Sequence, residues 1–122
     1  MRYVYLAGGK SRPDWRERLW TRWGERTDIV LIDPFVHSKQ GAIYEFTRDD
    51  LSWIDMSSLV FALVDFERYT GTALEFGYAF AKGVPIVFVT TLPRVDSMMA
   101  AVASAVFTDL DAAAEFVERR YL

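Results

Sequence analysis

Five short apolar runs alternate along the chain with longer segments in which apolar residues recur at helical spacing. The runs have the unbroken hydrophobicity of buried parallel strands and span residues 3–7, 28–32, 58–64, 85–89 and 105–107. The segments with helical spacing span residues 13–23, 44–56, 72–82, 95–103 and 108–120. This strict alternation predicts an α/β fold with a doubly wound, five-stranded parallel sheet and helices on both faces. Residues 35–42 show no period and predict a loop.

We expect the flavodoxin-like strand order 2-1-3-4-5, in which the direction of the connections reverses between strands 1 and 3. Ligands of open α/β sheets bind outside the carboxyl ends of the strands at such a reversal. The two loops there would be residues 8–12 and residues 65–70. The sequence therefore predicts one ligand crevice between them.

The segment TGTALEFGYAFAKGVP, residues 70–85, would follow the third strand. Thr72 and Glu75 fit a T-x-x-E capping box, which places a carboxylate in the first helical turn beside the crevice. Gly83, followed by a proline, would end the helix. Small residues four apart would let the helix pack closely on a neighbour; they are Ala73, Gly77 and Ala81.

Composition narrows the classes of function. At 122 residues and 52% apolar content, the chain predicts a single packed domain over residues 1–122. A net charge of -3 argues against a nucleic-acid polymer as partner. The chain has no cysteine and a single histidine, His37, in an irregular segment where we expect a surface position. We therefore predict neither a disulfide nor a metal site, and no cofactor.

Membrane association is not predicted either. No apolar run approaches the roughly 18 residues that a spanning helix needs. The apolar run near the N-terminus is too short for a signal peptide and fits a first strand better. We therefore expect a cytoplasmic protein.

Three acidic or phenolic side chains would converge at the crevice: Tyr5 from the first strand, Asp50 from the second helix and Glu75 from the third. A carboxylate pair is what glycosidic bond cleavage uses, one group as nucleophile and the other as proton donor. The helix start should lower the pKa of Glu75 and keep it ionised, whereas a nearby negative charge should help Asp50 hold its proton.

A glycine loop and two cations adjoin these groups. Gly8 and Gly9 allow the backbone to approach a ligand and to present N–H groups to an anion, and Lys10 and Arg12 add positive charge. This combination suits a phosphorylated or sugar-containing ligand.

Structural interpretations of the same residues stay open on spacing alone. Glu75 and Asp50 both fit helix caps, the second through a T-x-x-D pair with Thr47. Tyr5 fits the core, and Lys10 with its neighbours fits a solvated loop.

Six segments carry a family resemblance: VYLAGG (4–9), PDW (13–15), DP (33–34), DDLSWIDMSSLVFALV (49–64), GTALEFGYAFAKGVPIV (71–87) and RVDSMM (94–99). In this order they resemble the nucleoside 2-deoxyribosyltransferase superfamily, which also includes the 2'-deoxynucleoside 5'-phosphate N-hydrolases. The pattern GT-x-x-E-x-G-x-A followed by G-x-P-I is the most specific part.

The resemblance implies an enzyme that acts on the N-glycosidic bond of 2'-deoxynucleosides or their 5'-monophosphates. Glu75 stands at the position of the nucleophile that attacks C1' and forms a glycosyl-enzyme intermediate. Asp50 matches the acid that handles the nucleobase proton or the sugar hydroxyls, and Tyr5 matches the tyrosine that positions the nucleophile.

The candidate substrate-binding residues are Gly8, Gly9, Lys10, Tyr69, Gly71 and Ser97. Ser97 falls where the hydrolase branch of the superfamily has a serine that reaches a neighbouring subunit's site. The resemblance therefore implies a homodimer or a higher homo-oligomer.

Two positions depart from the family pattern. Tyr69 stands where transferases often carry an aspartate, and Ser58 where many relatives have one. Asp65 or Glu67 is placed to substitute. These departures leave base preference open, together with the choice between transfer and hydrolysis. Two further hypotheses remain: a nucleotide-binding or sensing domain without turnover, and an oligomeric module whose small-residue helices serve only assembly.

Overall fold

The computed structural model describes residues 1–9 and 14–122. The strands are β1 (Arg2–Gly8), β2 (Ile29–Ile32), β3 (Leu59–Val64), β4 (Ile86–Thr90) and β5 (Ala105–Phe107). The helices are α1 (Asp14–Trp23), α2 (Pro34–His37), α3 (Ile43–Met56), α4 (Thr70–Ala81), α5 (Ser97–Val102) and α6 (Leu110–Arg120).

The sheet has five parallel strands in the order β2-β1-β3-β4-β5, which confirms the predicted topology. β3 lies at its centre, and all of its residues are buried, as an unbroken apolar run predicts. Tyr5 of β1 is in register with Ile32 of β2 and Val60 of β3. The reversal of connections therefore falls between β1 and β3, as expected.

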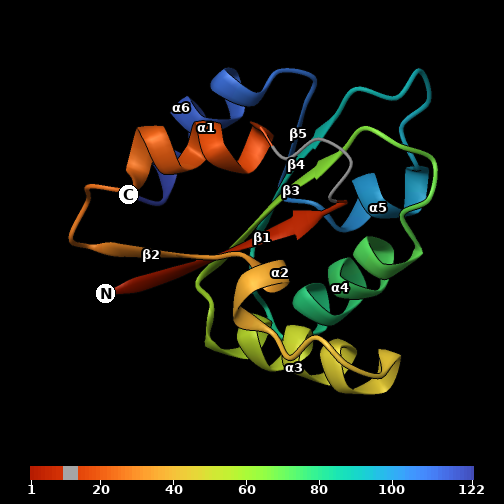
Figure 1. The fold of residues 1–122 in the computed structure, drawn as a ribbon. Helices are drawn as coiled ribbons and strands as arrows, with labels where there is room; N and C mark the ends of the chain where they lie inside the picture. Colours follow the sequence, from red (N-terminus) through yellow and green to blue (C-terminus); the bar gives the residue numbers. More distant parts are fainter. Residues whose placement is uncertain (10–13) are drawn as a thin grey trace.

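Helices cover both faces of the sheet, with α1 and α6 on one face and α3, α4 and α5 on the other (Figure 1). Because side chains alternate along a strand, each strand contributes to both layers. In β1, Leu6 packs with the α1–α6 layer, whereas Tyr5 packs with the α3–α5 layer. This alternation puts Tyr5 on the side of the sheet that carries Asp50 and Glu75.

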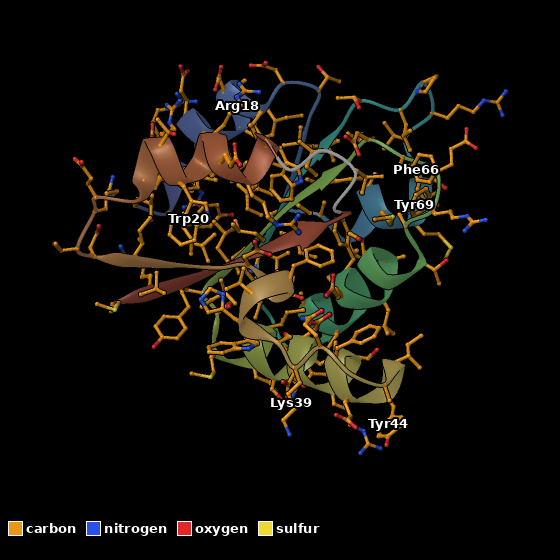
Figure 2. All side chains as sticks on the ribbon, in the orientation of Figure 1. Arg18, Trp20, Lys39, Tyr44, Phe66 and Tyr69 are labelled. Carbon is orange, nitrogen blue, oxygen red and sulfur yellow. The ribbon has the colours of Figure 1, made fainter. Side chains whose placement is uncertain are left out.

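Trp15, Leu19 and Trp23 form a stripe along one face of α1, and this stripe lies in the core. Trp15, Leu19 and Trp23 are each at most 3% exposed, whereas Trp20 is 43% exposed and points outward (Figure 2). Trp23 contacts the ring of Phe61 edge-on, with ring centroids 5.8 Å apart. The stripe therefore anchors α1 to the central strand.

Both predicted capping boxes are wrong because the helices begin earlier than expected. α4 starts at Thr70 after the N-cap Tyr69, which makes no side-chain cap, so Thr72 already lies inside the helix. α3 starts at Ile43, and the hydroxyl of Thr47 donates back to the Ile43 carbonyl at 2.5 Å. Glu75 and Asp50 are therefore not caps.

The small-residue row of α4 does not form its packing surface. Gly77 and Ala81 are exposed, and the helix packs through Phe76 and Ala79 instead. The end of the helix is as predicted, with Gly83 at a φ of 73°.

Residues 34–37 form the short helix α2 where a loop was expected. Asp33 caps it by accepting a hydrogen bond from the Phe35 N–H at 3.0 Å, and Pro34 occupies its first position. Asp96 and Asp109 cap α5 and α6 in the same manner.

Candidate active site

A cavity of about 250 Å³ opens at the carboxyl end of β1, between α2, α3 and α4. Its lining comprises Gly8, Pro34, Phe35, Gln40, Phe46, Thr47, Asp50, Leu51, Gly71, Thr72, Leu74 and Glu75. The cavity lies at the reversal of the strand connections, where the crevice was predicted. Of the two loops that were expected to form it, the first contributes Gly8, whereas described residues of the second, such as Asp65 and Tyr69, line a separate hollow. Helices α2, α3 and α4 supply the other walls.

The two carboxylates that the sequence singled out both face this cavity. Asp50 comes from the middle of α3 and is half-buried, and Glu75 comes from α4 and is 8% exposed. Each carboxyl group changes the acidity of the other: Asp50 raises the pKa of Glu75, and Glu75 lowers that of Asp50. The Tyr5 hydroxyl donates to Glu75 Oε2 at 2.5 Å from beneath. Tyr5 and Asp50 are 45 positions apart in the chain, and Asp50 and Glu75 are 25 apart, yet β1, α3 and α4 bring the three side chains together.

Burial, more than any partner, sets the charge state of Glu75. Burial, helped by the neighbouring carboxyl group of Asp50, raises the pKa of Glu75 to about 8. The Tyr5 hydrogen bond and the charge of Arg16 oppose the increase. The predicted low pKa of Glu75 is therefore wrong, because the side chain lies in a desolvated site instead of at a helix start.

The partners of Glu75 also have altered acidity. Burial raises the pKa of Asp50 above its ordinary value. The pKa of Tyr5 is raised by burial and by the charge of Glu75, so this phenol remains a hydrogen-bond donor. At neutral pH the carboxyl pair therefore keeps one proton, held by Glu75, in the ligand-free protein.

Apolar side chains form the walls beside the carboxyl pair. Phe46 and Leu51 come from α3, Phe35 from α2 and Leu74 from α4. Flat apolar walls with a few convergent polar groups are typical of small-molecule sites and accept a ring such as a nucleobase. The sequence did not identify these residues, since their contribution depends on how α2 and α4 approach α3.

Gly8 forms part of the cavity floor and has a backbone that only glycine tolerates. Its φ is 138°, and a Cβ atom there would lie 2.3 Å from the Leu63 carbonyl oxygen. Gly71 also lines the cavity. Both residues were predicted to bind substrate, and both lie at the surface of the cavity, where a ligand could reach them.

Other candidate residues lie outside this cavity. Gly9 and Tyr69 line a second hollow of about 140 Å³, which shares Thr72 with the first. The Tyr69 hydroxyl donates to Asp96 Oδ2 at 3.1 Å and so joins the start of α4 to the start of α5 (Figure 2). Ser97 is exposed on α5 and lines neither hollow.

Two further predictions concern residues away from the site. Lys10 and Arg12, the two cations of the glycine loop, fall outside the residues that the structure describes. His37 is exposed, as expected, and its Nδ1 lies 2.9 Å from the Asp33 carbonyl oxygen.

Arg16 is a neighbour of the site that the sequence analysis missed. It is 5% exposed, and its guanidinium donates to the carbonyl groups of Leu6, Gly8 and Gly9 at the end of β1. The only sequence signal was its place beside Trp15 on the buried edge of the α1 stripe. An arginine flanked by tryptophan at a helix start reads equally as a surface residue.

Residues 1–9 and 14–122 contain no group of three histidine, cysteine, aspartate or glutamate side chains placed to hold a metal ion. In the same ranges, no helix combines the length and the apolar character needed to span a bilayer.

The topology and the placement of the cavity define a doubly wound α/β protein with its site at the reversal of the sheet, and solved structures share this fold. A 2-deoxyribosyltransferase from Leishmania mexicana superposes with a TM-score of 0.76 at 20% identity over all of both chains. The 2-deoxyribosyltransferase of Bacillus psychrosaccharolyticus gives 0.72 at 18% identity, over 90% of this chain and 88% of that one. The CMP N-glycosidase of Clostridium botulinum gives 0.71 at 18% identity, over 99% of this chain and all of that one.

Sequence comparison identifies the family. The profile described as Nucleoside 2-deoxyribosyltransferase matches residues 4–108, which include both carboxylates, Tyr5 and the glycine loop. The chain belongs to the nucleoside 2-deoxyribosyltransferase family. A search of curated protein sequences gave no match.

Proposed function

We propose that this protein, acting as one domain over residues 1–122, breaks the N-glycosidic bond of a 2'-deoxynucleoside or its 5'-monophosphate. One observation carries the proposal: Glu75 and Asp50 line the wall of one cavity, and the Tyr5 hydroxyl is hydrogen-bonded to Glu75. We infer that the pair holds one proton between its two carboxyl groups, because burial raises the pKa of Glu75. Membership of a family whose named relatives transfer deoxyribosyl groups or cleave CMP supports it.

The shared proton gives the pair both of the functions that this reaction needs. As the C1'–N bond breaks, its electron pair goes to the nucleobase nitrogen. The proton passes from Glu75 through Asp50 to the base, so that Glu75 becomes a carboxylate as the sugar becomes electrophilic. A Glu75 oxygen then bonds to C1', which gives a glutamyl glycosyl-enzyme intermediate.

The second half of the reaction reverses these roles. Asp50 accepts a proton from water, or from the nitrogen of a second nucleobase, as that atom attacks C1'. The bond from C1' to Glu75 breaks, and the carboxyl pair regains its proton. Tyr5 remains hydrogen-bonded to Glu75 and fixes the direction in which the attacking oxygen points.

The apolar walls support a position for the base. Phe35, Phe46 and Leu74 bound the cavity beside the carboxyl pair, and we propose that the nucleobase ring binds between them with its sugar facing Glu75. Exclusion of water by these walls would favour transfer to a second base, whereas an open mouth would favour hydrolysis.

The test is a panel of 2'-deoxynucleosides and their 5'-monophosphates, incubated with the protein with and without a second free base. Chromatography follows released or exchanged base. We expect turnover by the wild type and none by Glu75→Ala. Asp55→Asn is the matched control, because Asp55 lies on α3 but binds Tyr78 on the surface. Its activity should equal that of the wild type.

A second measurement addresses the covalent step. Intact-mass analysis of the wild type during turnover should show a species heavier by one deoxyribosyl group, and Glu75→Ala should not form it. Failure of every substrate to react, or equal turnover by Glu75→Ala, would exclude the proposed reaction.

The same panel decides between turnover and binding alone. A nucleotide-sensing domain would show a raised melting temperature with an intact ligand after long incubation. The hypothesis of a module that serves only assembly has less support, because side chains do not fill the cavity. We also propose a homodimer or larger assembly, in which Ser97 is exposed and accessible to a neighbouring subunit; light scattering measures this directly.

A further inference from the structure

Arg16 is a buried arginine beside the cavity that takes no part in the proposed chemistry. Its Nη2 donates to the carbonyl oxygen of Leu6 at 2.9 Å and to that of Gly8 at 3.0 Å. Its Nη1 donates to the carbonyl oxygen of Gly9 at 3.1 Å. These three carbonyls lie where the main chain leaves the sheet, so one side chain holds the whole end of β1.

The same guanidinium also contacts the start of α2, which forms part of the cavity wall. Its Nε lies 3.5 Å from Asp33 Oδ1, and its carbon lies 5.0 Å from the ring centroid of Phe35. Asp33 also caps α2 through the Phe35 N–H. Arg16 therefore connects the end of β1 to the start of α2, and both segments line the cavity.

This position is costly for a charged group. Burial lowers the pKa of Arg16, and the charge of Asp33 opposes that effect. A packing role alone would be served by an apolar side chain of similar volume. The planar fork of arginine, by contrast, can hold several carbonyl groups at fixed directions, which a lysine cannot do.

We infer that Arg16 is a positioning residue for the candidate active site: it fixes Gly8 at the cavity floor and Phe35 at the cavity wall, so that a bound nucleoside meets Glu75 in the reacting geometry. The inference rests on the proposed function for its substrate. Its structural part, the fixing of the β1 end, is independent of turnover.

The electrostatic surroundings agree with this placement. Within residues 1–9 and 14–122, the groups that act on the acidity of Glu75 are Tyr5 from β1, Asp50 from α3 and Arg16 from α1. Arg16 supplies the one positive charge among these three, and this charge lowers the pKa of Glu75. Asp33 faces Arg16 and partly offsets its charge.

The test compares Arg16→Lys and Arg16→Met with Arg22→Met. Arg22 lies on the same helix and pairs at 2.6 Å with Glu118 of α6, in the layer that does not carry Asp50 and Glu75, so its loss controls for a general loss of stability. Steady-state kinetics gives KM and kcat. Carbon-detected NMR of labelled glutamate follows the titration of Glu75, and the amide signals of Gly8 and Gly9 follow the β1 end.

For Arg16→Lys, which keeps the charge, we expect shifted Gly8 and Gly9 amide signals. We also expect a loss of about 10- to 100-fold in kcat/KM, carried mainly by KM, and a Glu75 midpoint near that of the wild type. For Arg16→Met we expect the same loss and a Glu75 midpoint at higher pH. Arg22→Met should change none of these.

Wild-type values of KM and of the Gly8 and Gly9 signals in Arg16→Lys would overturn the inference. This variant decides the question even if Arg16→Met fails to fold. A wild-type protein without turnover on any substrate would refute the proposed function instead, and the glycine signals with the Glu75 titration would then still test the role of Arg16.

Discussion

Replacing Glu75 by glutamine is expected to abolish turnover and, at the same time, to stabilise the folded protein. The folded state raises the pKa of Glu75 from 4.5 to about 8, mainly because the side chain is buried. The unfolded chain therefore releases this proton at a lower pH than the folded protein does. Between those two values the folded state binds more protons, so its stability falls as the pH rises.

The size of the effect follows from the two pKa values. Stability falls by about 1.4 kcal/mol per pH unit between them and levels off above the higher one. The full cost of ionising Glu75 in its site is about 4–5 kcal/mol. Glutamine has the same shape and no charge, its oxygen can still accept from Tyr5, and its N–H₂ group faces Asp50. Glu75→Gln therefore avoids this cost.

Urea unfolding, followed by tryptophan fluorescence, measures the free energy of unfolding of both proteins from about pH 5.5 to pH 9. We expect the advantage of Glu75→Gln over the wild type to grow by about 3 kcal/mol between pH 5.5 and pH 8, then to stay level. At the upper end this corresponds to a rise in melting temperature of about 10 °C or more.

Glu118→Gln is the control with the opposite sign. Its hydrogen bonds with Arg22 lower the pKa of Glu118 to about 2, so Glu118 is ionised in the folded and the unfolded state throughout this pH range. The variant should lose stability by the same amount at every pH. A stability difference for Glu75→Gln that does not change between pH 5.5 and pH 8 would refute the reasoning that burial raises the pKa of Glu75.

Three further predictions concern the same site. Gly8→Ala should lower the free energy of unfolding by about 3 kcal/mol or more, measured by urea unfolding, because its Cβ would overlap the Leu63 carbonyl and its φ is positive; an unchanged value would contradict the described turn. Tyr5→Phe should move the titration of Glu75 to higher pH, because the hydrogen bond from Tyr5 lowers the pKa of Glu75. NMR titration measures this shift, and a shift to lower pH would contradict the prediction. Asp50→Asn should reduce kcat by about 10²- to 10⁴-fold, because the leaving base loses its proton donor. A nucleoside with a more acidic leaving base should recover part of this loss, and equal losses for both substrates would argue against proton donation by Asp50.

The fold was predictable because its buried strands appear in the sequence as short apolar runs. The apolar run of β3 has no polar interruption, and a parallel strand buried on both faces needs such a run. Helix starts were less predictable, because Thr70 and Ile43 begin their helices without a side-chain cap. The capping patterns at Thr72 and Thr47 therefore predicted helix starts that are later in the chain than the observed ones.

The meeting of Tyr5, Asp50 and Glu75 at one place was predictable from the sequence, but the charge state of Glu75 was not. Strand alternation and topology placed Tyr5, Asp50 and Glu75 on one side of the sheet. The pKa of Glu75 depends on how much water the neighbouring helices exclude from its side chain. A sequence pattern does not show how closely those helices pack. The position of Arg16 beside the site was not predicted for a related reason. Its partners are backbone carbonyl groups, which every residue has and which a sequence pattern therefore cannot single out.

The sheet separates the proposed chemistry from the surface of α6, and the chain contains no cysteine. A single cysteine introduced at Glu115, which is exposed on α6, would therefore be a unique chemical handle on the far face of the molecule (Figure 1). Coupled through that thiol to a solid support or a dye, the protein would keep its cavity turned toward the bulk solution.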